Sequence, residues 1–179
     1  MAPSPVLAVP FWAAALALAI SGLSKLNRPG PLVRMLAAAD LPASPGAVRS
    51  LAAGELVLGS VALMAPSRWA ALTLATAYLC FAAFLWAVLA WRIEVPSCGC
   101  AGERDLPPSP LHVGLDLVAG ASGIVAAATG PSFGGVPSAM RTMPLAGLPL
   151  VAGVVLIVWL AFLFAAYLPG LMTAYRRQS

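Results

Sequence analysis

The chain has 179 residues, of which 61% are hydrophobic and only 9% are charged, and its formal net charge at pH 7 is +4. A soluble globular domain has about 25% charged residues, so this composition excludes an ordinary water-soluble fold and indicates an integral membrane protein. A positive net charge can accompany nucleic-acid binding. No stretch of this sequence is basic enough for that function, so we expect the lipid bilayer and not nucleic acid as a partner.

Five apolar stretches are each close to the length that crosses a membrane, because a bilayer core about 30 Å thick needs roughly 20 helical residues. The sequence therefore predicts an all-α, polytopic transmembrane helical bundle, with a four-helix core and an additional C-terminal helix. We expect the contacts between helices to use small residues such as Ala119 and Gly123. The predicted spans are residues 5–24, 47–65, 68–92, 111–129 and 145–172.

The connections divide the chain into a core, a loop and a C-terminal addition. The core is residues 1–130, and it contains a connecting segment at 26–46 and a loop with two cysteines at 93–110. A loop rich in Gly, Pro and Ser follows at 131–144, and residues 145–179 form the last helix and a basic tail.

The middle of the first connection, residues 31–40, has apolar residues interleaved with Arg34 and Asp40. This pattern predicts a short helix that lies at the membrane interface.

Lysine and arginine residues gather at one end of the predicted bundle. With five spans, Arg68 and Arg141 fall at one face and eight basic residues fall at the other. Because cytoplasmic loops carry an excess of Lys and Arg, we expect the N-terminus outside, the C-terminus in the cytoplasm and the two-cysteine loop on the cytoplasmic face. The eight residues are Lys25, Arg28, Arg34, Arg49, Arg92, Arg104, Arg176 and Arg177.

Two ionisable residues, Lys25 and Glu55, fall in or near the first two spans. An acid at bilayer depth is costly, so Glu55 is expected to face the bundle interior with a partner or a proton. It could act as a proton carrier or as an anchor for a bound headgroup or quinone, but a hydrogen-bonded structural acid is the favoured interpretation. Lys25 is expected to snorkel to the interface, with an inward turn toward Glu55 or Asp116 as the alternative.

His112 and Asp116 lie four residues apart and therefore share one face of the fourth predicted helix. His112 is the only histidine of the chain. It could exchange protons with nearby cysteine thiols while Asp116 orients it. Alternatively, both are polar residues at an interfacial helix start, where the helix dipole favours Asp116.

Cys98 and Cys100 flank a single glycine, in the segment "EVPSCGCAGERD" at 94–105. Residues two apart can approach within the roughly 4.4–6.8 Å that a disulfide needs between Cα atoms. A ring this small closes no useful loop, and strained disulfides are labile or catalytic more often than structural. A thiol–disulfide redox pair is the leading interpretation. A zinc or copper site with His112, and two incidental small residues, stay open as alternatives.

Cys80, near the middle of the third predicted span, is the third cysteine. A lone cysteine in an apolar helix usually packs as a small hydrophobic residue, and this role is expected here. Cys98 lies eighteen residues further on, about 27 Å along a straight helix, so a disulfide between the two is not expected.

Four short sequence motifs follow one another along the chain: "SGLSKL" at 21–26, "AGELVLGSVALM" at 53–64, "CGCAG" at 98–102 and "HVGLDLV" at 112–118. On these motifs the sequence resembles the MauE family, the membrane proteins of methylamine utilisation, which are akin to DoxX-type four-helix membrane proteins. Where the family has "CGCFG", this chain has Ala101 in place of the phenylalanine.

The resemblance implies a multi-pass inner-membrane protein that works in thiol redox with a thioredoxin-like partner. Cys98 and Cys100 carry over as redox residues, and Glu55 as a family-typical residue of unassigned role. The resulting expectation is thiol–disulfide exchange through this pair, with His112 as its acid/base neighbour, without a bound cofactor and with enzymatic turnover left open. The alternatives are a non-catalytic accessory or scaffold subunit of a redox complex and a metal-handling membrane protein.

Overall fold

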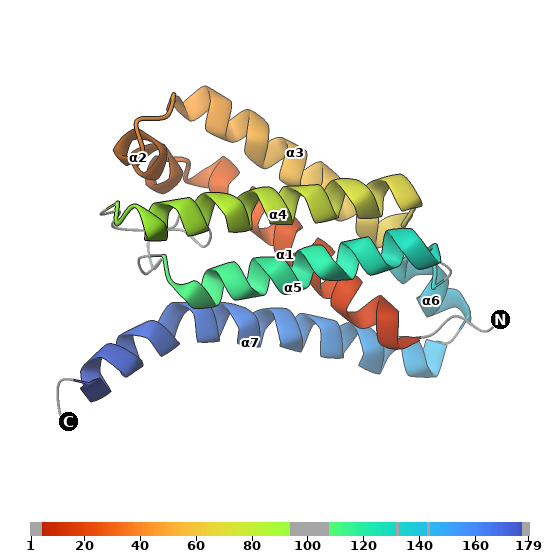
Figure 1. The fold of residues 1–179 in the computed structure, drawn as a ribbon. Helices are drawn as coiled ribbons and strands as arrows, with labels where there is room; N and C mark the ends of the chain where they lie inside the picture. Colours follow the sequence, from red (N-terminus) through yellow and green to blue (C-terminus); the bar gives the residue numbers. More distant parts are fainter. Residues whose placement is uncertain (1–4, 94–107, 132, 143, 177–179) are drawn as a thin grey trace.

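The computed structural model describes residues 5–93, 108–131, 133–142 and 144–176. Within these ranges the chain is helical apart from short connections, and no strand occurs, which confirms the predicted all-α fold (Figure 1). The helices are α1 (Pro5–Asn27), α2 (Gly30–Ala38), α3 (Pro45–Met64), α4 (Arg68–Ala90), α5 (Pro110–Thr129), α6 (Val136–Thr142) and α7 (Pro144–Arg176).

Five of these helices are long and apolar enough to cross a membrane, which confirms the five predicted spans. Trp69 and Trp91 lie near the two ends of α4 and are 78% and 76% exposed. Twenty-two residues of helix separate them by roughly 33 Å, close to the thickness of a bilayer core, and Trp favours both membrane interfaces. The spans are Ala8–Asn27, Pro45–Met64, Arg68–Ala90, Pro110–Thr129 and Gly147–Ala165.

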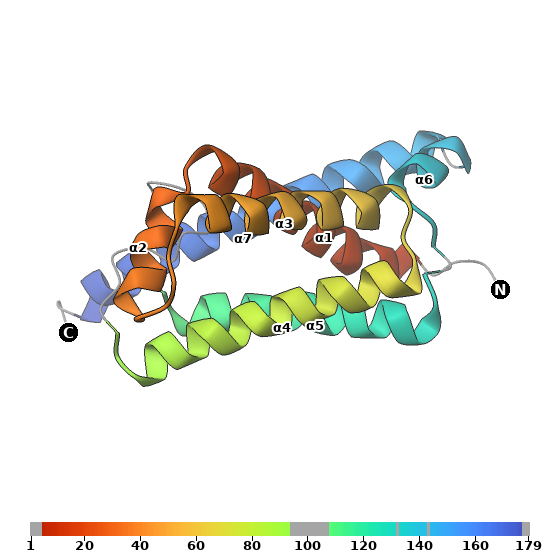
Figure 2. The ribbon, with the colours of Figure 1, turned by 90° about the horizontal axis from the view of Figure 1, so that it is seen from above.

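The long helices form two layers. α1 packs most extensively against α3, and α4 packs most extensively against α5. Seen from above, α1 and α3 lie on one side and α4 and α5 on the other, while α7 contacts α1 and crosses it at an angle (Figure 2). The end of α1, α2, the end of α4, the start of α5 and the C-terminal end of α7 all lie at the same end of the bundle (Figure 1).

Helix starts and ends follow local chemistry. Ser44 and Ser67 cap α3 and α4, because each hydroxyl accepts a hydrogen bond from the backbone N–H three residues on, at 3.1 Å. α2 and α4 end with Asp40 and Arg92 in the left-handed region, at φ 55° and 53°. At the end of α4, the Ile93 N–H donates to the Val88 carbonyl at 3.0 Å, so the helix stops in a Schellman-type turn before Pro96 is reached.

Two segments between the membrane spans differ from the sequence prediction. A short helix, α6, forms within residues 131–144, where only a loop was predicted. The predicted helix at 31–40 is confirmed as α2, although it begins one residue earlier and ends two residues earlier.

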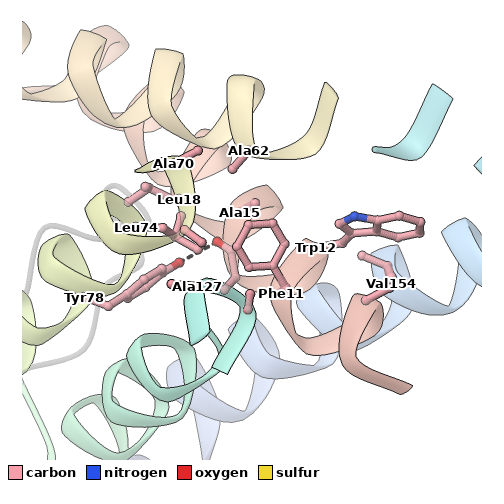
Figure 3. Close-up of a cluster of buried hydrophobic side chains, with 14 of the residues drawn as sticks. Phe11, Trp12, Ala15, Leu18, Ala62, Ala70, Leu74, Tyr78, Ala127 and Val154 are labelled. Atoms are coloured by element: carbon pink, nitrogen blue, oxygen red, sulfur yellow. Dashed lines mark hydrogen bonds between the residues drawn. The ribbon is translucent and has the colours of Figure 1, made fainter. Parts of the chain in front are cut away.

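The main hydrophobic core lies between the two layers, and α1 contributes more of its buried residues than any other helix (Figure 3). Phe11 and Trp12 are almost fully buried, and both rings contact Phe133, with centroids 5.5 and 6.3 Å apart. These contacts fix the segment after α5 against α1. Most of the remaining core residues are alanines, so the helices approach closely.

A candidate functional site within the bundle

Lys25 of α1 and Glu55 of α3 form a buried ion pair. The Lys25 Nζ lies 2.7 Å from one carboxylate oxygen of Glu55 and 2.8 Å from the other. The two side chains are only 6% and 3% exposed. The prediction that Lys25 snorkels to the interface is therefore wrong. Its partner lies on the neighbouring helix, and pairing offsets the several kcal/mol that each buried ion would otherwise cost.

The two helices can bring these side chains together because glycines let their backbones touch. A Cβ on Gly22, three residues before Lys25, would lie 2.6 Å from the Ala52 carbonyl oxygen. A Cβ on Gly59, four residues after Glu55, would lie 2.5 Å from the Ala15 carbonyl oxygen. Only glycine fits such close approaches, so the ion pair stands between two points at which α1 and α3 are in backbone contact.

Helix α4 contributes two aromatic residues to the same region. The Lys25 Nζ lies 5.0 Å from the centroid of the Phe81 ring, within the range of a cation–π interaction. Tyr78, one turn earlier, packs edge-on against Phe81. The Tyr78 hydroxyl donates a hydrogen bond to the Ala14 carbonyl at 2.7 Å (Figure 3). Sequence analysis missed both residues, although their spacing of three within one apolar helix placed them on a common face.

A cavity of about 510 Å³ lies beside the ion pair, between α1, α4, α5 and α7, and Leu32, Met35 and Leu36 of α2 also line it. Its wall is largely apolar, with Phe81, Phe84 and Phe162 among its residues. The titratable side chains in this wall include Lys25, His112 and Asp116. They lie near the end of α1 and the start of α5, which meet at one end of the bundle, so the cavity has a polar end and an apolar end (Figure 1).

His112 and Asp116 both face this cavity, as their spacing predicts. The Oγ of Ser109 lies 2.8 Å from the Nδ1 of His112, so Ser109 holds the imidazole in place instead of capping α5. Asp116 is the seventh residue of α5, beyond the first turn. The interpretation of Asp116 as an acid favoured by the helix dipole is therefore not supported, because that effect falls off within one turn.

The predictions for the three cysteines stand differently against the structure. Cys98 and Cys100 lie outside the described residues, so their pairing stays a prediction. Cys80 is a free thiol and is exposed on α4, where it also lines the cavity, so its expected role as a small hydrophobic residue stays a prediction. Among the residues that the structure describes, no group of three His, Cys, Asp or Glu side chains could hold a metal ion.

Comparison with known proteins identifies the family of this chain. The family model described as Methylamine utilisation protein MauE matches residues 3–133. The chain is a member of the MauE family. The match covers α1 to α5, and thus the ion pair and most of the cavity wall, whereas α6 and α7 lie beyond it. Searches of curated proteins and of solved structures found no match.

Proposed function

We propose that this MauE family membrane protein carries out thiol–disulfide exchange between Cys98, Cys100 and a thioredoxin-like partner. The observation that carries the proposal is the position of His112. The chain's only histidine lies at the start of α5, hydrogen-bonded to Ser109, at the bundle end where residues 94–107 join α4 to α5. A proton acceptor therefore lies at the end of the bundle where the segment with the cysteine pair joins α4 and α5.

The chemistry is an exchange of one disulfide for another. His112 takes the proton from the attacking thiol, and the thiolate forms a new S–S bond with one sulfur of the partner's disulfide. The partner's other sulfur leaves as a thiolate and takes up a proton. The second cysteine of the pair then attacks the mixed disulfide, which releases the reduced partner and leaves Cys98 and Cys100 oxidised.

The orientation belongs to the same proposal, with the N-terminus outside and the C-terminus and the cysteine pair on the cytoplasmic side. It is supported by the fold, because Lys25, Arg34, Arg49 and Arg92 lie near helix ends that meet at one end of the bundle, whereas Arg68 and Arg141 lie near ends at the other. This separation is the one that the positive-inside rule describes.

Thiol trapping in growing cells tests the proposal. Cells are quenched in acid, free thiols are alkylated with a reagent that adds mass, and the protein is examined before and after reduction. The expected result is a reversible shift that disappears in both Cys98→Ser and Cys100→Ser and persists in Cys80→Ser. Cysteines that stay reduced under oxidising and reducing conditions alike would contradict the proposal.

A second candidate function is that of a non-catalytic accessory subunit. It is favoured by α7, which packs against α1 and α6 and leaves Leu148, Trp159 and Phe164 exposed. This surface suits lipid or the helices of another membrane subunit. The two functions differ in the variant lacking both Cys98 and Cys100, because an accessory subunit keeps its function without the pair.

A further inference from the structure

We infer that the cavity between α1, α4, α5 and α7 is a binding site for an isoprenoid quinone, which serves as the electron acceptor of the proposed thiol exchange. The inference rests on the proposed function for its redox role, whereas the binding site itself rests on the cavity. Three observations carry it: the size and position of the cavity, the distribution of polar groups along it, and the charge at its polar end.

The size and position suit a molecule that reaches the protein from the bilayer. A volume of about 510 Å³ is within the range of small-molecule sites. The wall extends along α1 from Pro10 to Lys25, and fifteen residues of helix span roughly 22 Å along the helix axis. The helices along its length, α1, α4, α5 and α7, are membrane spans, and α2 also contributes to the wall. An apolar ligand would therefore enter from lipid between the spans.

The polar groups are concentrated at one end. Lys25, His112 and Asp116 lie at the end of the bundle that carries the start of α5, and the side chains toward the middle of the membrane are mostly aliphatic or aromatic. A ring with two carbonyl oxygens fits the polar end, where N–H donors are present, and Phe81 and Phe84 offer faces for stacking. An isoprenoid tail fits the apolar remainder.

The charge at the polar end favours a neutral head over a phosphate. The Lys25 ammonium already has both carboxylate oxygens of Glu55 at 2.7 and 2.8 Å. The acidic residue of the wall, Asp116, offers a phosphate no positive charge. A phospholipid head would therefore find no unneutralised lysine there, whereas a quinone carries no charge that needs one.

The redox step balances with such an acceptor. The exchange supplies the electrons when it runs in the opposite direction: a reduced thioredoxin-like partner reduces the Cys98–Cys100 disulfide and leaves as a disulfide. The two thiols of the pair then lose two protons and two electrons as the S–S bond between them forms again. The quinone gains two electrons and two protons, forming two O–H bonds, and leaves as the quinol. His112, which lies in the cavity wall at the cysteine end of α5, is placed to pass protons toward the quinone oxygens.

Equilibrium dialysis of the purified full chain in detergent against decylubiquinone tests the site. Ala119→Trp on α5 fills the cavity, and Ala121→Trp, two residues on and exposed on the outer face of the same helix, is the matched control. We expect saturable binding of about one quinone per chain. Ala119→Trp is expected to weaken binding by at least about tenfold, and the control to leave it unchanged.

Because Ala119 packs against the core, a second filling variant guards against misfolding. Ala161→Trp fills the cavity from α7, with the exposed Ala152→Trp as its control, and gel filtration verifies that each variant is folded. Equal quinone binding in the filling variants and their controls would overturn the inference. Displacement of quinone by vesicles of phosphatidylglycerol would also overturn it, since it would identify a lipid site.

The binding site and the proposed function can fail separately. The Cys98→Ser, Cys100→Ser double variant is expected to bind decylubiquinone as the wild type does, because each serine is close in size to the cysteine that it replaces. Loss of thiol exchange with intact quinone binding would contradict the proposed function alone. Thiol exchange without quinone binding would contradict the inference alone.

Discussion

The Nζ of Lys25 contacts both carboxylate oxygens of Glu55, at 2.7 and 2.8 Å, inside a bundle whose helices are long enough to cross a membrane. The pair joins α1 to α3 at the level of the cavity's polar end. Since both ions are almost fully buried, each depends on the other for its solvation.

The ion pair is expected to behave as a unit in stability measurements. Lys25→Met alone and Glu55→Met alone each leave one buried ion unpaired, which costs roughly 3–5 kcal/mol of unfolding free energy. The double variant removes both ions and is expected to recover most of that loss. Unfolding of the purified protein by titration into denaturing detergent, followed by helical circular dichroism, measures all three. Additive losses in the double variant would contradict a coupled pair.

The contact between α1 and α3 gives a second prediction. In Gly59→Ala the new Cβ would meet the backbone at Ala15 and Ala19, so the helices must separate. We expect a loss of about 1–3 kcal/mol. Gly54→Ala, in the same helix with no atom within 4 Å of the new Cβ, is the control and is expected to stabilise slightly. Equal effects of the two substitutions in the same unfolding assay would show that the close approach is unimportant.

His112 gives a prediction about rate. His112→Gln keeps a polar side chain but removes the group that takes the thiol proton, so the exchange rate should fall about a hundredfold. Ser109→Ala keeps the imidazole and removes only the contact at Nδ1, so a smaller loss is expected. Both rates come from stopped-flow mixing of the reduced protein with an oxidised thioredoxin-like protein, over a range of pH. A His112→Gln rate equal to that of the wild type at every pH would exclude the acid/base role.

The orientation can be measured with a thiol reagent that does not cross membranes. In a Cys80→Ser background, Cys98 and Cys100 should stay unlabelled in intact cells and become labelled once the cells are opened. Ala65→Cys, at the opposite end of the bundle between α3 and α4, is the control and should be labelled in intact cells. The reverse pattern would mean that the protein is inserted with its C-terminus outside.

The spans were predictable from the sequence because hydropathy and length alone decide which helices cross a membrane. The prediction for Lys25 was wrong, because a lysine at the end of a span was expected to snorkel to the interface, and an inward turn toward Glu55 or Asp116 was only the alternative. The close approach of the two backbones at Gly22 and Gly59 makes Glu55 the partner of Lys25. This approach depends on how α1 and α3 pack. The short helix α6 was missed because its seven residues, which include a proline and a serine, carry no clear periodic pattern.

The cavity could not be predicted either, since it is bounded by side chains from helices far apart in the sequence. The pairing of His112 with Asp116 on one face followed from their spacing of four. Their place in the same cavity wall as Lys25 depends on the antiparallel arrangement of α1 and α5, which puts the end of one helix and the start of the other at the same end of the bundle.

The most direct test of thiol exchange is the capture of its covalent intermediate. When either Cys98 or Cys100 is replaced by serine, the remaining cysteine can form a mixed disulfide but cannot resolve it. We predict that at least one single variant, isolated from acid-quenched cells, carries a disulfide-linked thioredoxin-like protein that reduction releases. The double variant, which retains Cys80, should carry none. Absence of the adduct from both single variants would contradict the proposed function.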